Sequence, residues 1–212
     1  GGQCMLLRGE PGVAPGRVVG LGGGTGGTLA AKLAVGAGAE VTILEGYGPR
    51  VRELSDLFGS TARVLNSTPA NIEREIAEAD VVIGSILVPG AKAPKVVRRE
   101  HLKTMKPGTL LIDVAIDQGG CIETSRPTTY ADPIFEVDGI RHYCVANMPG
   151  AVPRTSTIAL TDATLPYDLR LAEGVREALD ADPALQLGLN TDAGKITFAG
   201  VADVFPDLPA AK

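Results

Sequence analysis

The chain has 212 residues, of which 44% are hydrophobic, and it carries a formal net charge of -5 at pH 7. This length suffices for one good core or two small ones, and no apolar run is long enough to span a bilayer. The negative charge argues against nucleic acid and acidic lipid as partners, because both would repel the chain. Three widely spaced cysteines and the lack of an opening export leader favour a cytoplasmic protein with reduced thiols and no zinc site.

The first two thirds of the chain alternate short apolar runs with segments of helical spacing. The apolar runs predict strands at residues 17–21, 40–44, 63–65, 80–88 and 109–115, with a short strand at 5–7 before them. The helical spacing predicts helices at residues 28–36, 50–58 and 72–79, and a partly helical connection at 96–105. Strands that alternate with helical crossovers predict an α/β fold with a mostly parallel, doubly wound sheet.

The last third of the chain follows a different pattern. A final strand or hairpin is expected around Val137 and residues 140–145. From Ser156 a long helix toward Leu179 is expected, interrupted or kinked at Pro166, and a less regular tail follows with a short strand at 195–198. We therefore expect a nucleotide-binding domain over residues 1–155 and a C-terminal helical segment over residues 156–212.

A glycine-rich turn directly follows the first predicted strand. Gly22, Gly24 and Gly27 satisfy the spacing G-x-G-x-x-G, in which the glycines allow a tight turn, close approach of a pyrophosphate, and packing of helix on strand. The N–H groups and the positive dipole end of the following helix favour phosphate. Glu45 ends the second strand, where a carboxylate binds the adenosine ribose. Together these features predict a dinucleotide site on a Rossmann-type sheet.

Polar and glycine-rich clusters follow the other predicted strands too, and ligands of open parallel sheets bind beyond the carboxyl ends of the strands. By this reasoning Asp117 is the carboxylate nearest the nicotinamide end of a bound dinucleotide, although a loop-capping aspartate would look the same. Asp113 lies within an apolar run and is expected to accept from a backbone or side-chain donor.

Four basic residues lie near these clusters. Arg50 could reach the adenosine side and Arg126 a ribose or phosphate, but a solvated helix-start arginine and a surface turn residue fit equally. Lys92 and Lys95 could contact an anion, although lysines in such loops are usually solvated.

The two histidines indicate no catalytic or metal site. His101 and His142 have no serine, cysteine or second histidine at a spacing that a catalytic triad or a metal would need.

Several long motifs resemble bacterial L-alanine dehydrogenase, over essentially the whole chain. They are residues 88–95 (VPGAKAPK), 105–108 (MKPG), 113–121 (DVAIDQGGC), 126–129 (RPTT) and 143–157 (YCVANMPGAVPRTST). The central motifs are also similar to the NAD-binding domain I of proton-translocating transhydrogenase.

The resemblance implies reversible oxidative deamination of L-alanine to pyruvate and ammonia with NAD, by a homo-oligomer that is commonly a hexamer. Asp117 matches the family's catalytic aspartate, which assists proton movement as water adds to or leaves the imine carbon. Glu45 stands where the family usually has an aspartate, and it should still repel the 2′-phosphate of NADP. The implied cofactor-binding residues are Gly22, Gly24, Thr25, Gly26, Gly27, Glu45, Arg50, Ser67, Ile86, Leu87, Val114, Ala115, Ile116, Arg126, Val145, Ala146, Asn147 and Met148.

Relatives of this kind carry further chain before the equivalent of Gly1. That part supplies the arginine and lysine that hold the substrate carboxylate, and a catalytic histidine. The segment after about Ser156 resembles the part that folds back onto this lobe, so it is expected to expose apolar surface or to form oligomer contacts.

Three hypotheses follow. The chain is the cofactor-binding portion of an alanine dehydrogenase, with weak or no turnover alone. Alternatively, it is a non-catalytic dinucleotide-binding module, such as a sensor, a regulatory subunit or half of a split enzyme. The third is a transhydrogenase-like domain with a second nucleotide domain and a membrane part as partners.

Overall fold

A computed structural model describes residues 3–88 and 93–210. The chain divides into two compact units, which we describe separately. One comprises Gly1–Val88 and Lys92–Asn147, and the other is essentially Met148–Lys212, as far as their residues are described.

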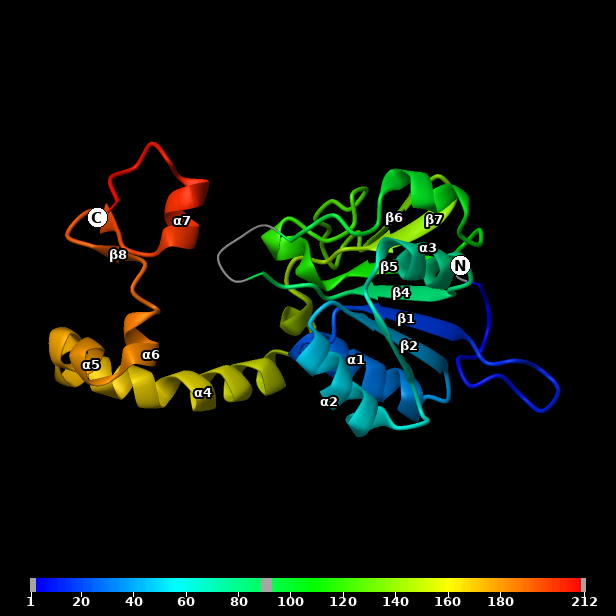
Figure 1. Ribbon diagram of the computed structural model, residues 1–212, viewed down its shortest axis with the longest axis horizontal. Helices are drawn as coiled ribbons and strands as arrows, with labels where there is room; N and C mark the ends of the chain where they lie inside the picture. Colours follow the sequence, from blue (N-terminus) through cyan, green and yellow to red (C-terminus); the bar gives the residue numbers. More distant parts are fainter. Residues whose placement is uncertain (1–2, 89–92, 211–212) are drawn as a thin grey trace. The chain divides into compact units, whose positions relative to one another are not determined.

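Within the described residues of the first unit, the strands are β1 (Arg17–Leu21), β2 (Glu40–Glu45), β3 (Arg63–Asn66), β4 (Val81–Gly84), β5 (Leu110–Asp113), β6 (Ile134–Val137) and β7 (Ile140–Tyr143). They form one sheet in the order β3-β2-β1-β4-β5-β7-β6 (Figure 1). All neighbouring pairs are parallel except β6 and β7, which form an antiparallel hairpin. The predicted doubly wound α/β sheet is therefore confirmed.

Helices cover both faces of this sheet, and the alternation of side chains along β1 explains how. Val18 packs in a cluster with residues of α1 (Thr25–Gly36) and α2 (Gly48–Phe58). Val19, its neighbour, points to the opposite face and packs in a cluster with residues of α3 (Pro69–Ala77) and of the 3-10 helix η1 (Arg99–Lys103). Both faces of the central strands are thus buried, as parallel strands with continuous apolar runs require.

Two strands end earlier than predicted. β4 ends at Gly84, not at residue 88, because its neighbour β1 ends at Leu21, where the chain turns at Gly22 with a φ of +96°. β5 ends at Asp113, and the residues expected to continue it form a 3-10 helix, η2 (Val114–Gln118). Gly84 pairs with Leu21 on one side and Asp113 on the other, so neither neighbouring strand offers β4 a partner beyond Gly84, and the apolar runs give no sign of this.

Other element predictions differ in detail. Helix α3 begins at Pro69, before the predicted start, because the Thr68 hydroxyl caps it by accepting from the N–H of Asn71 at 3.2 Å. The connection predicted as partly helical forms only the short η1. Residues 5–7 form no strand.

The second unit consists of helices and one small hairpin. Its elements are η3 (Met148–Ala151), α4 (Pro153–Glu173), α5 (Val175–Ala181), α6 (Pro183–Gln186), β8 (Thr191–Asp192), β9 (Lys195–Ile196) and α7 (Ala199–Val204). Helix α4 spans Pro166, where an interruption or a kink was expected, and is not interrupted there; it ends before Gly174, whose φ of 163° and ψ of 116° are not helical.

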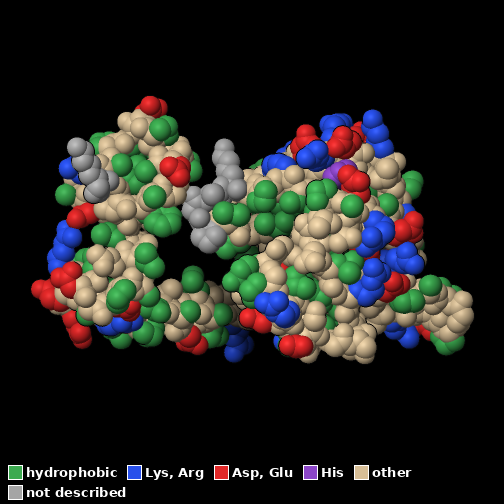
Figure 2. All heavy atoms as spheres, viewed as in Figure 1, with side chains coloured by type: hydrophobic (Ala, Val, Ile, Leu, Met, Phe, Trp, Pro, Cys, Tyr) green, Lys and Arg blue, Asp and Glu red, His purple; other side chains and the backbone are tan. Residues whose placement is uncertain are grey.

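Helix α4 has no buried residue. Its exposed large side chains include Ile158, Leu160, Leu165, Tyr167 and Leu169. Apolar side chains are visible among charged ones over this unit in Figure 2.

No helix in the described part of the chain is long and apolar enough to cross a membrane.

Candidate dinucleotide site

The three motif glycines have distinct surroundings at the carboxyl end of β1. Gly22 has a φ of +96°, which favours glycine in the turn out of the strand. A Cβ on Gly27 would lie 1.9 Å from the Gly22 carbonyl oxygen, so only glycine lets α1 pack this closely. Gly24 and Gly26 face open space, because a Cβ on either would meet no heavy atom within 4 Å. The surroundings match the turn, approach and packing roles that the motif predicts.

Glu45 is turned toward this loop. Its Oε2 accepts from the N–H of Gly23 at 2.7 Å, and its Oε1 accepts from the N–H of Tyr47 at 2.8 Å. A carboxylate has about four lone-pair sites, so both oxygens can still accept a hydroxyl. The carboxylate is therefore held in one orientation beside the helix start.

Arg50 also contacts the loop, from the first turn of α2. Its Nε donates to the Gly23 carbonyl at 2.8 Å, and its Nη2 donates to the Thr28 hydroxyl at 3.0 Å. Its Nη1 pairs with Glu53 at 2.7 Å. Each nitrogen of the guanidinium thus has a protein partner, and the side chain braces the loop, which a solvated arginine would not do.

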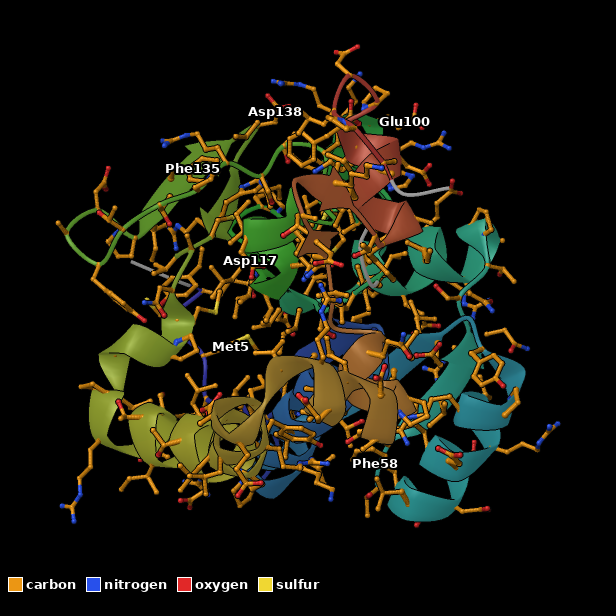
Figure 3. All side chains as sticks on the ribbon, turned by 90° about the vertical axis from the view of Figure 1, so that its left-hand side faces the viewer. Met5, Phe58, Glu100, Asp117, Phe135 and Asp138 are labelled. Carbon is orange, nitrogen blue, oxygen red and sulfur yellow. The ribbon has the colours of Figure 1, made fainter. Side chains whose placement is uncertain are left out.

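A cavity of about 330 Å³ opens above the glycine loop. Asp117, which Figure 3 labels, is exposed on η2, and it is one of the residues that line this cavity. Next to it the Oε1 atom of Gln118 is buried and has no hydrogen-bond partner among the described residues. The other lining residues are Gly24, Thr25, Gly26, Ser85, Ile86, Leu87, Val114 and Ala115.

Two charged residues, the buried Asp113 and the exposed Lys95, hold the loop that follows η2. Asp113 is fully buried and accepts from the N–H groups of Cys121 at 3.2 Å and Ile122 at 3.1 Å, as expected for a structural partner. The Nζ of Lys95 donates to the carbonyls of Gly119, Gly120 and Ile122, the second at 2.8 Å. Lys95 therefore donates to backbone carbonyls, whereas the two roles considered from the sequence were contact with an anion and exposure to solvent. Lys92 lies outside the described residues.

The remaining predicted residues of the first unit lie at other strand ends. The N–H of Ser67, just beyond β3, donates to the carbonyl of Glu45 at 2.9 Å. Val145, Ala146 and Asn147 follow β7, and Arg126 lies on the segment beside them. Ile116 is a buried residue of η2 itself. Met148 begins the second unit, and its role stays a prediction.

Sequence reasoning missed two residues here. The Ser85 hydroxyl donates to the carbonyls of Leu21 at 3.1 Å and Gly22 at 3.0 Å, tying the end of β4 to the glycine turn. A polar residue within an apolar run was the available signal. The second missed residue is Gln118, beside Asp117, because nothing in the local sequence distinguishes a buried glutamine amide from an exposed one.

Burial shifts the pKa values of the buried histidine and of the two buried cysteines. His142 donates or accepts at the Ile140 carbonyl (3.0 Å) and the Thr124 hydroxyl (2.7 Å), and burial lowers its pKa below the ordinary 6.5. Burial and then the charge of Asp113 raise the pKa of the Cys121 thiol to about 12. Burial also raises the pKa of Cys144. No cluster that could hold a metal occurs in the described residues.

Comparison with known families supports this geometry. Residues 1–199 match the model of the family described as "Alanine dehydrogenase/PNT, C-terminal domain". An alanine dehydrogenase of Halomonas elongata is 53% identical over 206 residues, and alanine dehydrogenase 2 of Staphylococcus aureus is 53% identical over 207 residues. Each alignment covers 97% of this chain but 56% of the relative, so the chain spans little more than half their length.

Solved structures give the same result. An L-alanine dehydrogenase superposes with a TM-score of 0.87 at 50% identity, covering 98% of this chain and 57% of that one. A transhydrogenase from Sinorhizobium meliloti superposes with a TM-score of 0.61 at 29% identity, covering 69% of this chain and 41% of the other.

Proposed function

The chain belongs to the alanine dehydrogenase/PNT C-terminal domain family, and on this premise we propose that it is the dinucleotide-binding part of an NAD-dependent L-alanine dehydrogenase. The proposed reaction is the reversible oxidative deamination of L-alanine to pyruvate and ammonia. The observation that carries the proposal is the open backbone at Gly24 and Gly26 beside the oriented carboxylate of Glu45.

The family implies a nicotinamide dinucleotide as cofactor, and the residues present fit one. The open space at Gly24 and Gly26 lies at the start of α1, where backbone N–H groups and the helix dipole attract a diphosphate. Glu45 would accept the ribose hydroxyls with its remaining lone pairs. Gln118, whose buried Oε1 has no hydrogen-bond partner among the described residues, also lines this cavity, and a polar group of the cofactor could supply that partner.

We propose NAD as the cofactor in preference to NADP. A 2′-phosphate beside Glu45 would meet a carboxylate held in place by two backbone N–H groups. Arg50 is the nearby cation, but Gly23, Thr28 and Glu53 already occupy its nitrogens. A phosphate would therefore meet repulsion without a ready counter-charge.

When bound, the nicotinamide supplies the hydride acceptor or donor. Asp117 would take up and release the proton that moves as water adds to or leaves the imine carbon, because it is exposed in the cavity and makes no hydrogen bond with a described residue. Asp113 and Lys95 would hold its loop in position. The residues that would bind the substrate carboxylate are proposed to belong to the part of the family that this chain does not span.

Three further assignments belong to this proposal. Residues 1–155 are the nucleotide-binding domain and residues 156–212 part of the substrate domain. The whole protein self-associates as a homo-hexamer, which the exposed apolar residues of α4 support. It works in the cytoplasm, where buried thiols such as Cys121 and Cys144 stay reduced.

Calorimetric titration of this chain with NADH and with NADPH tests the proposal. We expect binding of NADH, weaker binding of NADPH, and loss of NADH binding in Glu45→Arg. We expect little oxidation of alanine by this chain alone. An absence of NADH binding to the folded wild-type chain would overturn the proposal.

A transhydrogenase-like domain and a non-catalytic binding module are the alternatives. The share of this chain that superposes on each solved structure favours a dehydrogenase. The L-alanine dehydrogenase structure covers 98% of the chain, and the transhydrogenase structure covers 69%. Alanine oxidation on adding, as a separate polypeptide, the part of the family that this chain does not span would exclude the non-catalytic module.

A further inference from the structure

Three side chains of the β6–β7 region form a stack outside the cavity. The guanidinium carbon of Arg126 lies 4.2 Å from the centroid of the Phe135 ring. The same phenyl ring stacks with the His142 imidazole, at 4.9 Å between centroids and 21° between planes. Figure 3 labels Phe135 on strand β6. The phenyl ring thus connects an exposed cation to the buried part of the hairpin.

The base of the stack is fixed. Phe135 and His142 are direct cross-strand partners in the β6–β7 hairpin. The His142 side chain is fully buried, and its two ring nitrogens are engaged by the Thr124 hydroxyl and the Ile140 carbonyl. A ring locked on both nitrogens cannot rotate freely, so the phenyl ring that packs on it has one preferred position.

The top of the stack lies at the carboxyl end of β7, and ligands of open parallel sheets bind beyond such ends. The N–H of Thr128 donates to the Cys144 carbonyl at 2.9 Å, which holds the segment from Arg126 to Thr128 beside the end of β7. Arg126 is exposed, and within residues 3–88 and 93–210 its side chain makes no ion pair or hydrogen bond. Stacking uses the face of a guanidinium and leaves the N–H groups at its edge available to a phosphate or hydroxyl oxygen.

We propose that Phe135 is a positioning residue for Arg126, and that it orders the guanidinium for contact with a phosphate or ribose oxygen of the bound dinucleotide. The inference rests on the proposed function, and it assigns to an aromatic residue of the hairpin a share of the cofactor affinity. The ring itself touches no cofactor atom in this proposal.

Calorimetric titration of the folded chain with NADH tests the positioning role of Phe135. The proteins to compare are the wild type, Phe135→Leu, Phe135→Tyr, Arg126→Ala and the Phe135→Leu/Arg126→Ala double variant. A cation–π contact at an exposed site corresponds to about a two- to five-fold change in affinity, and we expect Phe135→Leu to weaken NADH binding by that factor. Phe135→Tyr keeps the ring and should bind as wild type does. The double variant should bind no more weakly than Arg126→Ala, because the ring acts through the guanidinium.

Arg126→Lys gives a second measurement that leaves the hairpin core intact. It keeps the charge but loses the planar stack, so it should weaken binding as Phe135→Leu does. The inference is overturned if the wild type and Phe135→Leu bind NADH with equal affinity. It is also overturned if Phe135→Leu weakens binding further when Arg126→Ala is already present. In either case, NADH binding by the wild type leaves the proposed function standing. Unchanged affinity in Arg126→Ala would overturn it in the same way.

Discussion

The carboxylate of Glu45 accepts the N–H of Gly23 at 2.7 Å, across 22 positions of sequence. The contact joins the end of β2 to the glycine turn after β1. Gly23 is also held through its carbonyl, by Arg50 and by the hydroxyl of Thr28 at 3.0 Å. The carboxylate that we propose binds the cofactor's ribose therefore also shapes the turn that we propose binds its phosphates.

We predict that Glu45→Gln weakens NADH binding by at least about ten-fold, because a neutral amide cannot accept from both N–H groups and a ribose hydroxyl as a carboxylate does. The preference for NADH over NADPH should narrow, since the negative charge is gone. Titration calorimetry with both nucleotides measures the two effects.

Glu40→Gln is the matched control. Glu40 lies at the other end of β2, exposed and 3.3 Å from Arg17, and the change removes the same charge. Exposed ion pairs contribute little, so NADH affinity should stay within about two-fold of wild type. A comparable loss in both variants would show that net charge, not the contact at Gly23, governs binding.

Gly24 and Gly27 should respond differently to a side chain. Gly24→Val projects into open space in the free chain, so it should abolish NADH binding with little change in melting temperature. Gly27→Ala places a Cβ 1.9 Å from the Gly22 carbonyl and 2.5 Å from the Ser85 hydroxyl, and it should lower the free energy of unfolding by about 3 kcal/mol. Thermal unfolding followed by titration separates these outcomes. The assignment of the two glycines is wrong if Gly24→Val destabilises the chain as much as Gly27→Ala.

Asp113→Ala should destabilise the chain strongly. It leaves the buried N–H groups of Cys121 and Ile122 without their acceptor, at a cost of about 3 kcal/mol in the free energy of unfolding. Asp117→Ala, four residues on, removes an exposed carboxylate and should change that free energy by less than about 0.5 kcal/mol. Urea denaturation of both variants measures the contrast, and equal losses would contradict it.

His142 should make stability depend on pH. Its pKa is lowered in the folded state, chiefly by burial, so the unfolded chain takes up a proton at a higher pH than the native state does. The stability from this residue is fully present above the ordinary value of 6.5 and is lost as the pH falls below it toward the folded-state pKa. We expect the free energy of unfolding to decrease from about pH 8 to about pH 5, and the decrease to be smaller in His142→Gln. An equal decrease in both proteins would assign it to other groups.

Periodicity and composition predicted the sheet because each strand and helix carries its own pattern. The run from Val18 to Leu21 and the glycines after it specify strand, turn and helix within a dozen residues. The role of Asp113 was also predictable, since a charge inside an apolar run needs a partner wherever the fold supplies one.

Contacts between distant segments were not predictable in the same way. The bonds from Lys95 to the loop after η2 and the stack of Arg126, Phe135 and His142 each join residues whose local patterns say nothing of one another. The early ends of β4 and β5 have the same origin, because the turn after β1 at Gly22 and the start of η2 at Val114 end the pairing between strands while the apolar runs continue.

The sequence by itself determined the order of strands and helices, the glycine motif and the position of Glu45, because these depend on spacing along the chain. Only the tertiary structure decided what Arg50, Lys95 and Phe135 contact, since an arginine, a lysine or a phenylalanine in a loop or strand has the same local pattern whether solvent or protein surrounds it. The spacing of residues along the chain determines which groups lie at the carboxyl ends of the strands, and tertiary packing determines which of these groups contact one another.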